Sequence, residues 1–232
     1  MKIAVMQPYF LPYIGYFQLI NLVDKFVILD DVQFINKGWI NRNYILQKNK
    51  PLLFTIPVSK MNSKSLISET KVFYDSGKIS KFLKSVKLNY SSSPFFKEVF
   101  YLLENIFREK YTGISGLVLS GLYSVNDYLN INTNIIKSSS VYKNQQLKGE
   151  ERIIDICRQE GADEYFNLSG GVDIYSKEKF ESENIKLKFI KTKEIRYKQF
   201  ENEFTGPLSI IDNLMFNSPE EVKKSLLEFE IL

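Results

Sequence analysis

Two short hydrophobic runs near the start of the chain, Lys2 to Met6 and Lys25 to Leu29, have the length and composition of buried strands. The segment between them, Tyr16 to Leu22, has the length and composition of a short helix that begins after Gly15. A strand, a helix and a second strand in this order favour a parallel pair joined by a right-handed crossover.

The middle of the chain has the period of helices. From Gly77 to Leu129, apolar residues recur every three or four positions, which predicts three successive helices. Ser93 and Pro94 supply a predicted N-cap and first-turn proline for the second of them. Ahead of this region, the run from Leu52 to Val58 is bounded by prolines, which predicts a strand at a sheet edge or a strand end.

The alternation of strands and helices resumes after Asn134. Ser218 and Glu221 have the spacing of a capping box at the start of the last predicted helix. This pattern predicts an open, mostly parallel α/β sheet in a single domain over 1–232, with a helical insertion at about 77–130 and C-terminal helices. The predicted elements after the insertion are strands at 135–139, 164–168 and 187–190 and helices at 150–160, 208–216 and 219–229.

Composition and charge indicate what kind of protein this is and which partners to expect. With 44% hydrophobic and 25% charged residues, the chain is typical of a globular protein. No apolar run reaches the length of a bilayer span and no signal h-region follows Met1, so we expect a cytoplasmic protein without a membrane span. The net charge of +4 is spread along the chain without a basic block, which predicts no nucleic-acid partner and only a weak attraction to anions such as phosphates.

The absence of histidine excludes several kinds of catalysis. Serine hydrolases with a His base and Cys–His nucleophile pairs need an imidazole, and zinc sites need imidazoles or several thiolates. The single cysteine, Cys157, excludes internal disulfides, and its position on an apolar helical face predicts core packing. The sequence identifies no metal site and no cofactor, and it leaves open whether magnesium is used. Catalysis must use carboxylates, Lys, Tyr, Arg, amides or backbone groups.

The loop after the first strand combines two prolines, a glycine and five aromatic residues over 7–17. Open α/β sheets bind ligands outside the carboxyl ends of their strands, so a rigid loop here favours a ligand-shaped wall over a plug that covers the sheet edge. In that interpretation Gln7 offers an amide, Tyr9 and Tyr16 offer rings, and Gly15 lets a phosphate or carboxylate approach the helix N-terminus.

Two carboxylates, Asp30 and Asp31, close the second predicted strand. Such a pair can bind magnesium, accept a ribose hydroxyl or act as a base, and a solvated turn is equally compatible with the pattern. Neighbouring residues of a strand point to opposite faces, so at most one of the two enters a given pocket. We therefore expect substitutions of the two to differ sharply in their effect on activity and to leave folding nearly unchanged.

The only tryptophan, Trp39, precedes a cluster of polar residues, Asn41, Arg42 and Asn43. Arginine clamps phosphate or carboxylate groups with two hydrogen bonds, and asparagine supplies oriented donors and acceptors. An arginine stacked on a surface tryptophan is the structural alternative. Because the cluster follows closely on the Asp30–Asp31 strand end, we favour a binding role.

Small residues end a later strand at Ser169, Gly170 and Gly171. Their backbone amides are available to an oxyanion or a phosphate, although the segment lacks the Gly-Lys-Ser/Thr of a Walker loop. A plain tight turn is about equally compatible with these residues. If the carboxyl-end argument holds, this turn lines one cavity with Gln7, Arg42 and one of the two aspartates.

Five blocks of the sequence together resemble the bacterial WbqC-like protein family. The first three are specific in combination, and the helical middle of the chain adds little. The blocks are MQPYFLPYIGYF at 6–17, FVILDDVQF at 26–34, WINRN at 39–43, NLSGG at 167–171 and SIIDNLMFN at 209–217.

The resemblance implies a role in O-antigen or other surface-polysaccharide biosynthesis, adding an amino acid such as glycine, or another acyl group, to the amine of a nucleotide-linked amino sugar. The order of strand, loop, helix, strand and paired aspartates also looks like a Rossmann-like (HUP-like) nucleotide-binding fold of adenylyltransferase kind, but this chain lacks both histidines of that phosphate motif. A non-catalytic module that binds a nucleotide or nucleotide-sugar for a partner enzyme is a second hypothesis.

In the transferase hypothesis, Asp30 or Asp31 collects the proton of the sugar amine. The Gly170 and Gly171 amides, or Asn41, hold the oxyanion, and Arg42 holds a phosphate of a small-molecule substrate. The sequence leaves the oligomeric state open.

Overall fold

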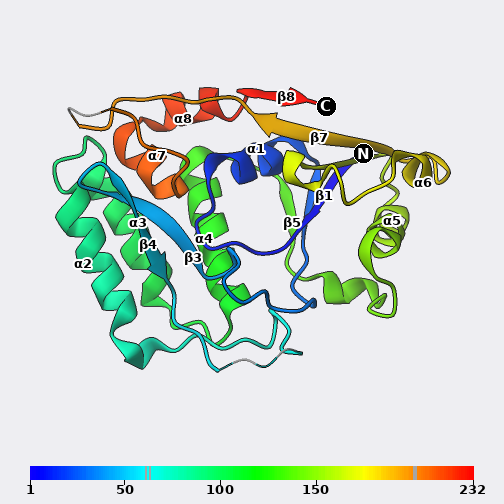
Figure 1. Ribbon diagram of the computed structural model, residues 1–232, viewed down its shortest axis with the longest axis horizontal. Helices are drawn as coiled ribbons and strands as arrows, with labels where there is room; N and C mark the ends of the chain where they lie inside the picture. Colours follow the sequence, from blue (N-terminus) through cyan, green and yellow to red (C-terminus); the bar gives the residue numbers. More distant parts are fainter. Residues whose placement is uncertain (61, 63, 201–202) are drawn as a thin grey trace.

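The computed structural model describes residues 1–60, 62, 64–200 and 203–232 (Figure 1). Its main sheet has the strand order β5-β2-β1-β6-β7-β8, in which the first five strands are parallel and β8 pairs antiparallel with β7. The predicted open, mostly parallel α/β sheet is thereby confirmed. The strands are β1 (Lys2–Met6), β2 (Lys25–Ile28), β5 (Asn134–Ile136), β6 (Glu164–Leu168), β7 (Lys186–Thr192) and β8 (Phe229–Ile231).

The pairing register brings the carboxyl ends of the parallel strands to one edge. Met6 pairs with Ile28, and Leu168 pairs with Ile190. From β1 the chain moves outward to β2 and β5, and it then returns to the other side of β1 to form β6 and β7. The direction of strand order therefore reverses between β1 and β6, which is where sheets of this kind hold ligands. The loops at this switch point begin at Gln7 and Ser169.

Alternating side chains divide the core between the two faces of the sheet. Ala4 and Phe26 belong to one hydrophobic cluster, and Ile3, Val5 and Val27 belong to another. The first cluster includes α1 (Ile14–Leu22) and the C-terminal helices, and the second includes α5 (Gly149–Glu160) and the short α6 (Lys177–Glu181). Both faces are covered, as a parallel sheet requires.

Cys157 lies on the buried face of α5, so its predicted packing role is confirmed. Burial raises the pKa of its thiol to about 12, which keeps the sulfur protonated and unreactive.

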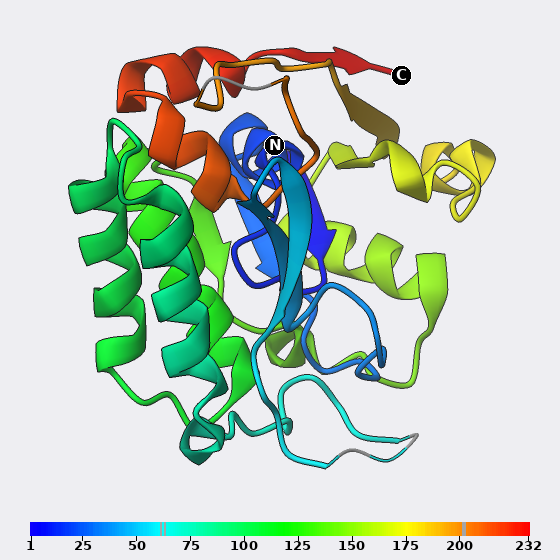
Figure 2. The ribbon, with the colours of Figure 1, turned by 60° about the vertical axis from the view of Figure 1, so that its left-hand side comes forward.

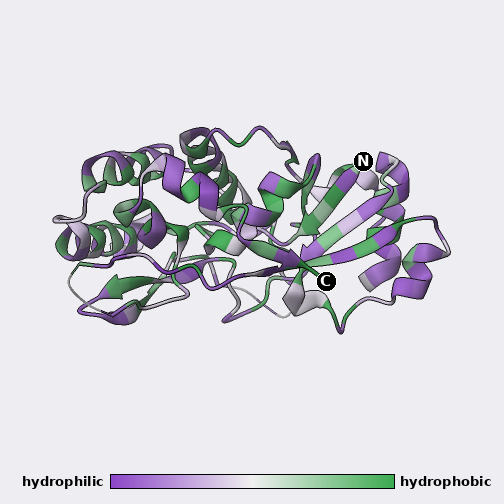
Figure 3. Cartoon of the chain, turned by 90° about the horizontal axis from the view of Figure 1, so that it is seen from above, coloured by the Kyte–Doolittle hydropathy of each residue, from purple (hydrophilic) through white to green (hydrophobic). Residues whose placement is uncertain are grey.

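The three predicted helices form at α2 (Lys78–Tyr90), α3 (Phe96–Arg108) and α4 (Ile114–Leu129). They stand side by side in Figure 2, and the view from above in Figure 3 shows this helical half beside the sheet half. The predicted N-cap at Ser93 is wrong, because its hydroxyl donates to the Tyr90 carbonyl at 2.8 Å and α3 begins at Phe96. No helix in the described ranges has the length and apolar content needed to cross a bilayer.

The predicted strand at 52–58 belongs to a separate hairpin. β3 (Arg42–Gln47) and β4 (Lys50–Thr55) pair antiparallel around Lys48 and Asn49, which both have positive φ. β3 was not predicted, because its first residues, Arg42 and Asn43, are polar and were interpreted as a binding motif.

The C-terminal prediction is right in part. α7 (Ile210–Phe216) forms, and α8 (Pro219–Ser225) begins with the predicted capping box between Ser218 and Glu221. The last helix does not continue to 229, because the chain turns and Phe229–Ile231 pairs with β7.

A buried carboxylate fastens α7 to the rest of the helical half. Asp212 is fully buried and accepts hydrogen bonds from the Tyr90 hydroxyl at 2.8 Å, the Tyr197 hydroxyl at 2.7 Å and the Gln199 amide at 2.6 Å. No cation is paired with it within the described residues. Burial raises the pKa of Asp212 to about 6 despite these three donors.

The raised pKa of Asp212 predicts a specific dependence of stability on pH. The folded state binds a proton at Asp212 below about pH 6, whereas the unfolded chain does so only near its ordinary pKa of about 3.9. The group therefore favours folding at low pH, and this contribution is lost as pH rises through 6. Relative to Asp212→Asn, we expect the wild-type free energy of unfolding to increase by about 2 kcal/mol between pH 7 and pH 4.

Urea unfolding of both proteins across this pH range measures the difference. A difference that is the same at every pH would show that Asp212 has an ordinary pKa.

Candidate functional site

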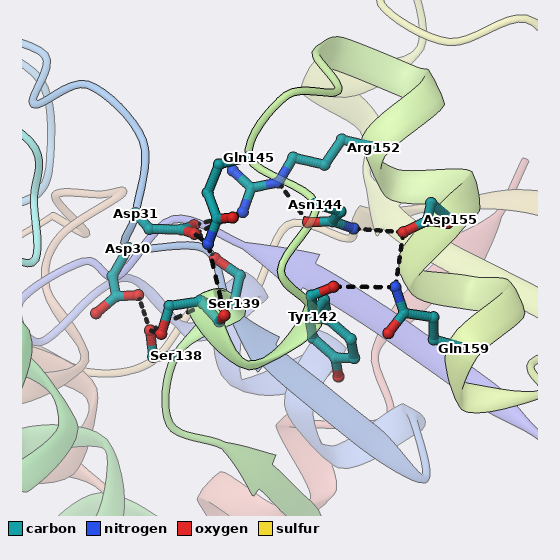
Figure 4. Close-up of polar contacts among 11 residues, drawn as sticks. Asp30, Asp31, Ser138, Ser139, Tyr142, Asn144, Gln145, Arg152, Asp155 and Gln159 are labelled. Carbon is teal, nitrogen blue, oxygen red and sulfur yellow. Dashed lines mark hydrogen bonds and ion pairs between the residues drawn. The ribbon is translucent and has the colours of Figure 1, made fainter.

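The two aspartates after β2 have different environments at the carboxyl edge of the sheet. Nη2 of Arg152, on α5, donates to both carboxylate oxygens of Asp31 at 2.7 Å, and Ser139 and Gln145 also donate to this carboxylate (Figure 4). Burial alone would raise the pKa of Asp31, but the hydrogen bonds from Arg152 and Ser139 outweigh it and hold the pKa below its usual value. Asp31 is therefore a buried, ionised partner of Arg152 and a weak base.

Asp30 is also buried but has fewer protein donors than Asp31. It is 4% exposed, and the Ser138 hydroxyl donates to its Oδ1 at 2.6 Å. Figure 4 shows the two carboxylates pointing in different directions, as the alternation of strand residues predicts. Burial raises the pKa of Asp30, so this carboxylate accepts a proton more readily than Asp31.

A chain of side chains extends from Arg152 into α5 and the preceding loop. Nε of Arg152 donates to Asn144 at 2.9 Å, and Asn144 donates to Asp155 at 2.7 Å. Gln159 donates to both Asp155 and the carbonyl of Tyr142, at the end of the 3-10 turn Ser139–Tyr142. This network fixes the segment after β5 in place, and with it the hydroxyls of Ser138 and Ser139.

Several predicted binding residues have structural contacts. Tyr16 is fully buried and its hydroxyl donates to the Gln7 carbonyl at 2.8 Å. The space that a Cβ would occupy at Gly15 is filled by the side chains of Tyr13 and Thr192, so this glycine permits close packing at the start of α1. Nδ2 of Asn43 donates to the Leu11 carbonyl at 2.9 Å and its Oδ1 accepts from the backbone of β3, which ties the hairpin to the loop after β1.

Aromatic side chains from this loop and the hairpin form a cavity of about 240 Å³, here called the aromatic cavity. Trp39 is 45% exposed, and its ring lies 5.8 Å from that of Tyr44. The wall also includes the predicted residues Tyr9 and Asn43. The remaining lining residues are Pro12, Tyr13 and Pro207.

A second cavity, of about 510 Å³, is lined by residues from 34–42, 55–58 and 73–78 and is here called the basic cavity. Its lining contains Lys37, Arg42, Lys78 and Asn41, and no acidic residue among the described ones. None of the three cations has an ion-pair partner in the described part of the chain. This arrangement attracts anions.

Arg42 and Trp39 connect the two cavities. The guanidinium carbon of Arg42 lies 5.6 Å from the centre of the Trp39 ring, and Nε of Arg42 donates to the Gly38 carbonyl at 2.8 Å. The stack on tryptophan is therefore present, but it leaves the two terminal nitrogens of Arg42 without a described partner. Nδ2 of Asn41 donates to the Ile56 carbonyl at 2.7 Å, so this amide is already occupied.

The turn after β6 and the side chain of Gln7 lie at the switch point of the sheet. Ser169–Gly171 forms a 3-10 turn, and a Cβ at Gly170 would meet no atom within 4 Å. Neither Gln7 nor this turn lines the aromatic or the basic cavity. The structure therefore distributes the predicted residues over two cavities and the sheet edge, instead of gathering them around one of these cavities.

Sequence reasoning missed several residues of these sites. Arg152 carries no local signal, because its carboxylate partner Asp31 is 121 positions away. Lys37 and Lys78 are ordinary surface lysines in sequence, and only the fold brings them beside Arg42. Ser138 could have been found, since it lies near the carboxyl end of the strand predicted at 135–139. No cluster of three or more potential metal ligands occurs within the described ranges.

Comparisons with known proteins relate the chain to one family. A sequence model of the WbqC-like protein family matches residues 7–224. The chain is also 31% identical over 221 residues to a protein named "Uncharacterized protein Rv1507c" from Mycobacterium tuberculosis (strain ATCC 25618 / H37Rv), and the match covers 93% of each chain. No solved structure matches.

The unequal environments of the aspartates predict unequal effects on stability. Asp31→Asn leaves the Arg152 guanidinium buried without its counter-ion, and we expect a loss of about 3–5 kcal/mol in the free energy of unfolding. Asp30→Asn keeps an oxygen for Ser138, so its cost should stay below about 1 kcal/mol. This differs from the expectation that neither substitution would affect folding.

Urea unfolding at pH 7 checks these values, with the exposed Asp173→Asn as the control. Because the pKa of Asp31 is lowered in the folded state, its contribution is present at neutral pH and is lost as pH falls through that pKa. Equal, small losses for Asp30 and Asp31 would contradict a structural role for the ion pair.

Proposed function

Because this chain belongs to the WbqC-like protein family, we propose that it is an enzyme of bacterial surface-polysaccharide (O-antigen) biosynthesis. We infer that it transfers an acyl or aminoacyl group, such as glycyl, to the amine of a nucleotide-linked amino sugar. The observation that carries this proposal is the pair of cavities, one aromatic and one basic, that meet at the stacked side chains of Trp39 and Arg42.

The aromatic cavity suits the sugar ring. Its walls carry the rings of Tyr9, Tyr13, Trp39 and Tyr44, which offer flat apolar faces together with polar edges. A sugar ring likewise has apolar C–H faces and a polar rim. A small cavity with mostly apolar walls buries such a ring and leaves its amine and hydroxyl groups at the edge.

The basic cavity suits the phosphates of the same ligand. A nucleotide-linked sugar carries a diphosphate next to the sugar ring, and Lys37, Arg42 and Lys78 supply three positive charges to a lining that includes no carboxylate among the described residues. Arg42 is held by Gly38 and Trp39, and its terminal nitrogens have no partner among the described residues, so it can form two parallel hydrogen bonds to a phosphate. In a nucleotide-linked sugar the phosphate lies close to the sugar ring. The stacking of Arg42 on Trp39 likewise brings the phosphate-binding side chain close to the ring that would contact the sugar.

The proposed reaction needs one proton acceptor and no imidazole. The amine nitrogen attacks the carbonyl carbon of the activated donor, a C–N bond forms, the bond to the leaving group breaks, and the amine releases a proton. Asp30 is the better acceptor of the two aspartates, because burial raises its pKa whereas Arg152 holds the pKa of Asp31 low. Asp30 itself lines neither cavity, and Phe34 and Lys37, which follow it in the same segment, line the basic cavity.

A non-catalytic role is the second candidate. Asp31 is saturated with protein donors and Asp30 already accepts from Ser138, an arrangement that a purely structural pair would also have. In this case the same cavities bind a nucleotide-sugar for a partner enzyme. A nucleotidyltransferase-like reaction is the third candidate, and the switch point between β1 and β6 favours it, although the chain has no histidine for the phosphate motif of such enzymes.

Binding of a nucleotide-linked amino sugar tests the two-cavity site. We expect Arg42→Lys to weaken binding by one to two powers of ten, because lysine keeps the charge but loses the planar pair of donors. Trp39→Ala should weaken binding by at least about tenfold through loss of stacking surface. Calorimetric titration measures both variants, and Arg108→Lys, on the exposed end of α3, is the matched control.

Melting curves without ligand should change little for Arg42→Lys. If Arg42 only stacks on Trp39, the affinity will stay the same and the melting temperature will fall slightly, by the equivalent of at most about 1 kcal/mol. If Arg42→Lys and Trp39→Ala both bind the nucleotide-linked sugar with wild-type affinity, the ligand does not bind in the two cavities.

Turnover separates an enzyme from a binding module. With a nucleotide-linked amino sugar and an acyl-thioester or aminoacyl donor, we expect wild-type protein to form the N-acylated sugar, detected by mass spectrometry. Asp30→Asn should retain binding and lower the rate by about 10²–10⁴-fold, the range of general base catalysis. Binding without product for any donor would instead support the non-catalytic module.

A further inference from the structure

A third cavity, of about 400 Å³, lies at the carboxyl end of β7, and it contains none of the residues predicted from sequence. It is here called the β7 cavity. One wall is formed by the start of α1, at Tyr13 and Ile14, and another by the residues from Thr192 to Tyr197 together with Phe204 and Gly206 to Leu208. α7 supplies Asn213. Its volume lies in the range of cavities that hold small molecules.

The carboxamide of Asn213 is unsatisfied in this wall. The residue is 4% exposed, and its Oδ1 is buried without a hydrogen-bond partner in the described part of the chain. No other residue of the cavity lining has such an atom among the described residues. Buried amide oxygens are nearly always paired in proteins, so an unpaired one beside a cavity indicates a missing donor from a ligand.

The orientation of Asn213 is fixed by its neighbour. Asp212 is held by Tyr90, Tyr197 and Gln199 on the side of α7 that faces the core. Because successive residues of a helix point in different directions, this anchor turns Asn213 away from the Asp212 cluster.

The same anchor orients the aromatic walls. The Tyr197 hydroxyl donates to Asp212 at 2.7 Å, and the Tyr197 ring lies 5.0 Å from the ring of Phe204 at an angle of 74°. Tyr13, on the opposite wall, packs together with Thr192 against the backbone of Gly15. Both tyrosine rings are therefore held in place before a ligand arrives, which lowers the entropic cost of stacking a flat group between them.

Cations stand at the rim of the β7 cavity. Lys193 pairs with Glu228 at 3.8 Å and Arg196 pairs with Glu194 at 2.6 Å, and all four side chains are about half exposed or more. Exposed pairs of this kind are weak, so either cation can turn to a phosphate at little cost.

We infer that the β7 cavity binds an adenine nucleotide. An asparagine carboxamide can accept a hydrogen bond from the adenine amino group and donate one to the neighbouring ring nitrogen, which is the pairing that asparagine makes with adenine in nucleic acids. Tyr13 and Tyr197 provide surfaces for the base, and Lys193 and Arg196 provide charges for the phosphate. The position at the carboxyl edge of a parallel sheet agrees with nucleotide binding.

The β7 cavity shares Tyr13 and Pro207 with the aromatic cavity. If the proposed acyl transfer holds, on which this step rests, the sugar amine and a donor activated by an adenine nucleotide would meet at this shared wall. The sugar would then approach from the side of Arg42 and the donor from the side of Asn213.

Calorimetric titration with AMP, in the absence of any sugar or acyl donor, tests the inference. We expect AMP to bind the wild-type protein and to bind Asn213→Ala at least about tenfold more weakly. Asn213→Asp keeps the size of the side chain but removes its donor, so it should weaken binding to a similar extent. Asn126→Ala is the matched control, because Asn126 is also buried with an unpaired Oδ1 but lies on α4, outside the β7 cavity.

Melting curves establish that each variant is folded. In the wild-type protein, the side-chain amide resonance of Asn213 in an ¹⁵N spectrum should shift when AMP is added. The inference would be overturned by any of three results: no AMP binding at millimolar concentration, AMP affinity in both Asn213 variants equal to that of the wild type, or wild-type affinity for UMP equal to that for AMP. Trp39→Ala should leave AMP binding unchanged, so failure of the sugar site and failure of the nucleotide site give different results.

Discussion

The carbonyl oxygen of Leu11 holds together the parts of the chain that form the aromatic and β7 cavities. It accepts one hydrogen bond from Nδ2 of Asn43 in β3, at 2.9 Å, and another from the Ser209 hydroxyl ahead of α7, at 2.6 Å. Leu11 has a positive φ of 44°, an unusual value for a residue with a branched side chain. The hydrogen bonds from Asn43 and Ser209 stabilise the backbone turn at Leu11. This turn sets the position of Tyr9 and Tyr13 over the sheet edge.

This arrangement explains why motif residues that adjoin in sequence have different roles. Side chains alternate along β3, so Arg42 lines the basic cavity whereas Asn43 turns to the loop after β1. The same holds after β2, where Asp31 binds Arg152 and Asp30 binds Ser138. In both pairs one residue binds a distant part of the chain with its polar side-chain atoms, and its neighbour has fewer hydrogen bonds to the described residues.

Local patterns predicted most of the fold and little of the site. The apolar runs of β1, β2, β6 and β7 and the helical period of α2 to α4 depend on nearby residues, so they can be recognised in one sequence. β8 could not be recognised, because Phe229 to Ile231 becomes a strand only by pairing with β7. The Asp31–Arg152 ion pair and the cations of the basic cavity join distant segments, and no short-range spacing encodes them.

The unpaired side-chain oxygen of Asn213 could not be predicted from the sequence, because only the structure shows that a buried atom has no described partner. Asn213 stands in the SIIDNLMFN block, where its neighbour Asp212 looks the more reactive residue. The structure reverses this order, since three protein donors satisfy Asp212 and Asn213 has an unpaired oxygen beside a cavity. Burying an amide without a partner destabilises a fold by about 1–3 kcal/mol. A ligand that pairs with Asn213 would recover part of that free energy, which links occupancy of the β7 cavity to the stability of α7.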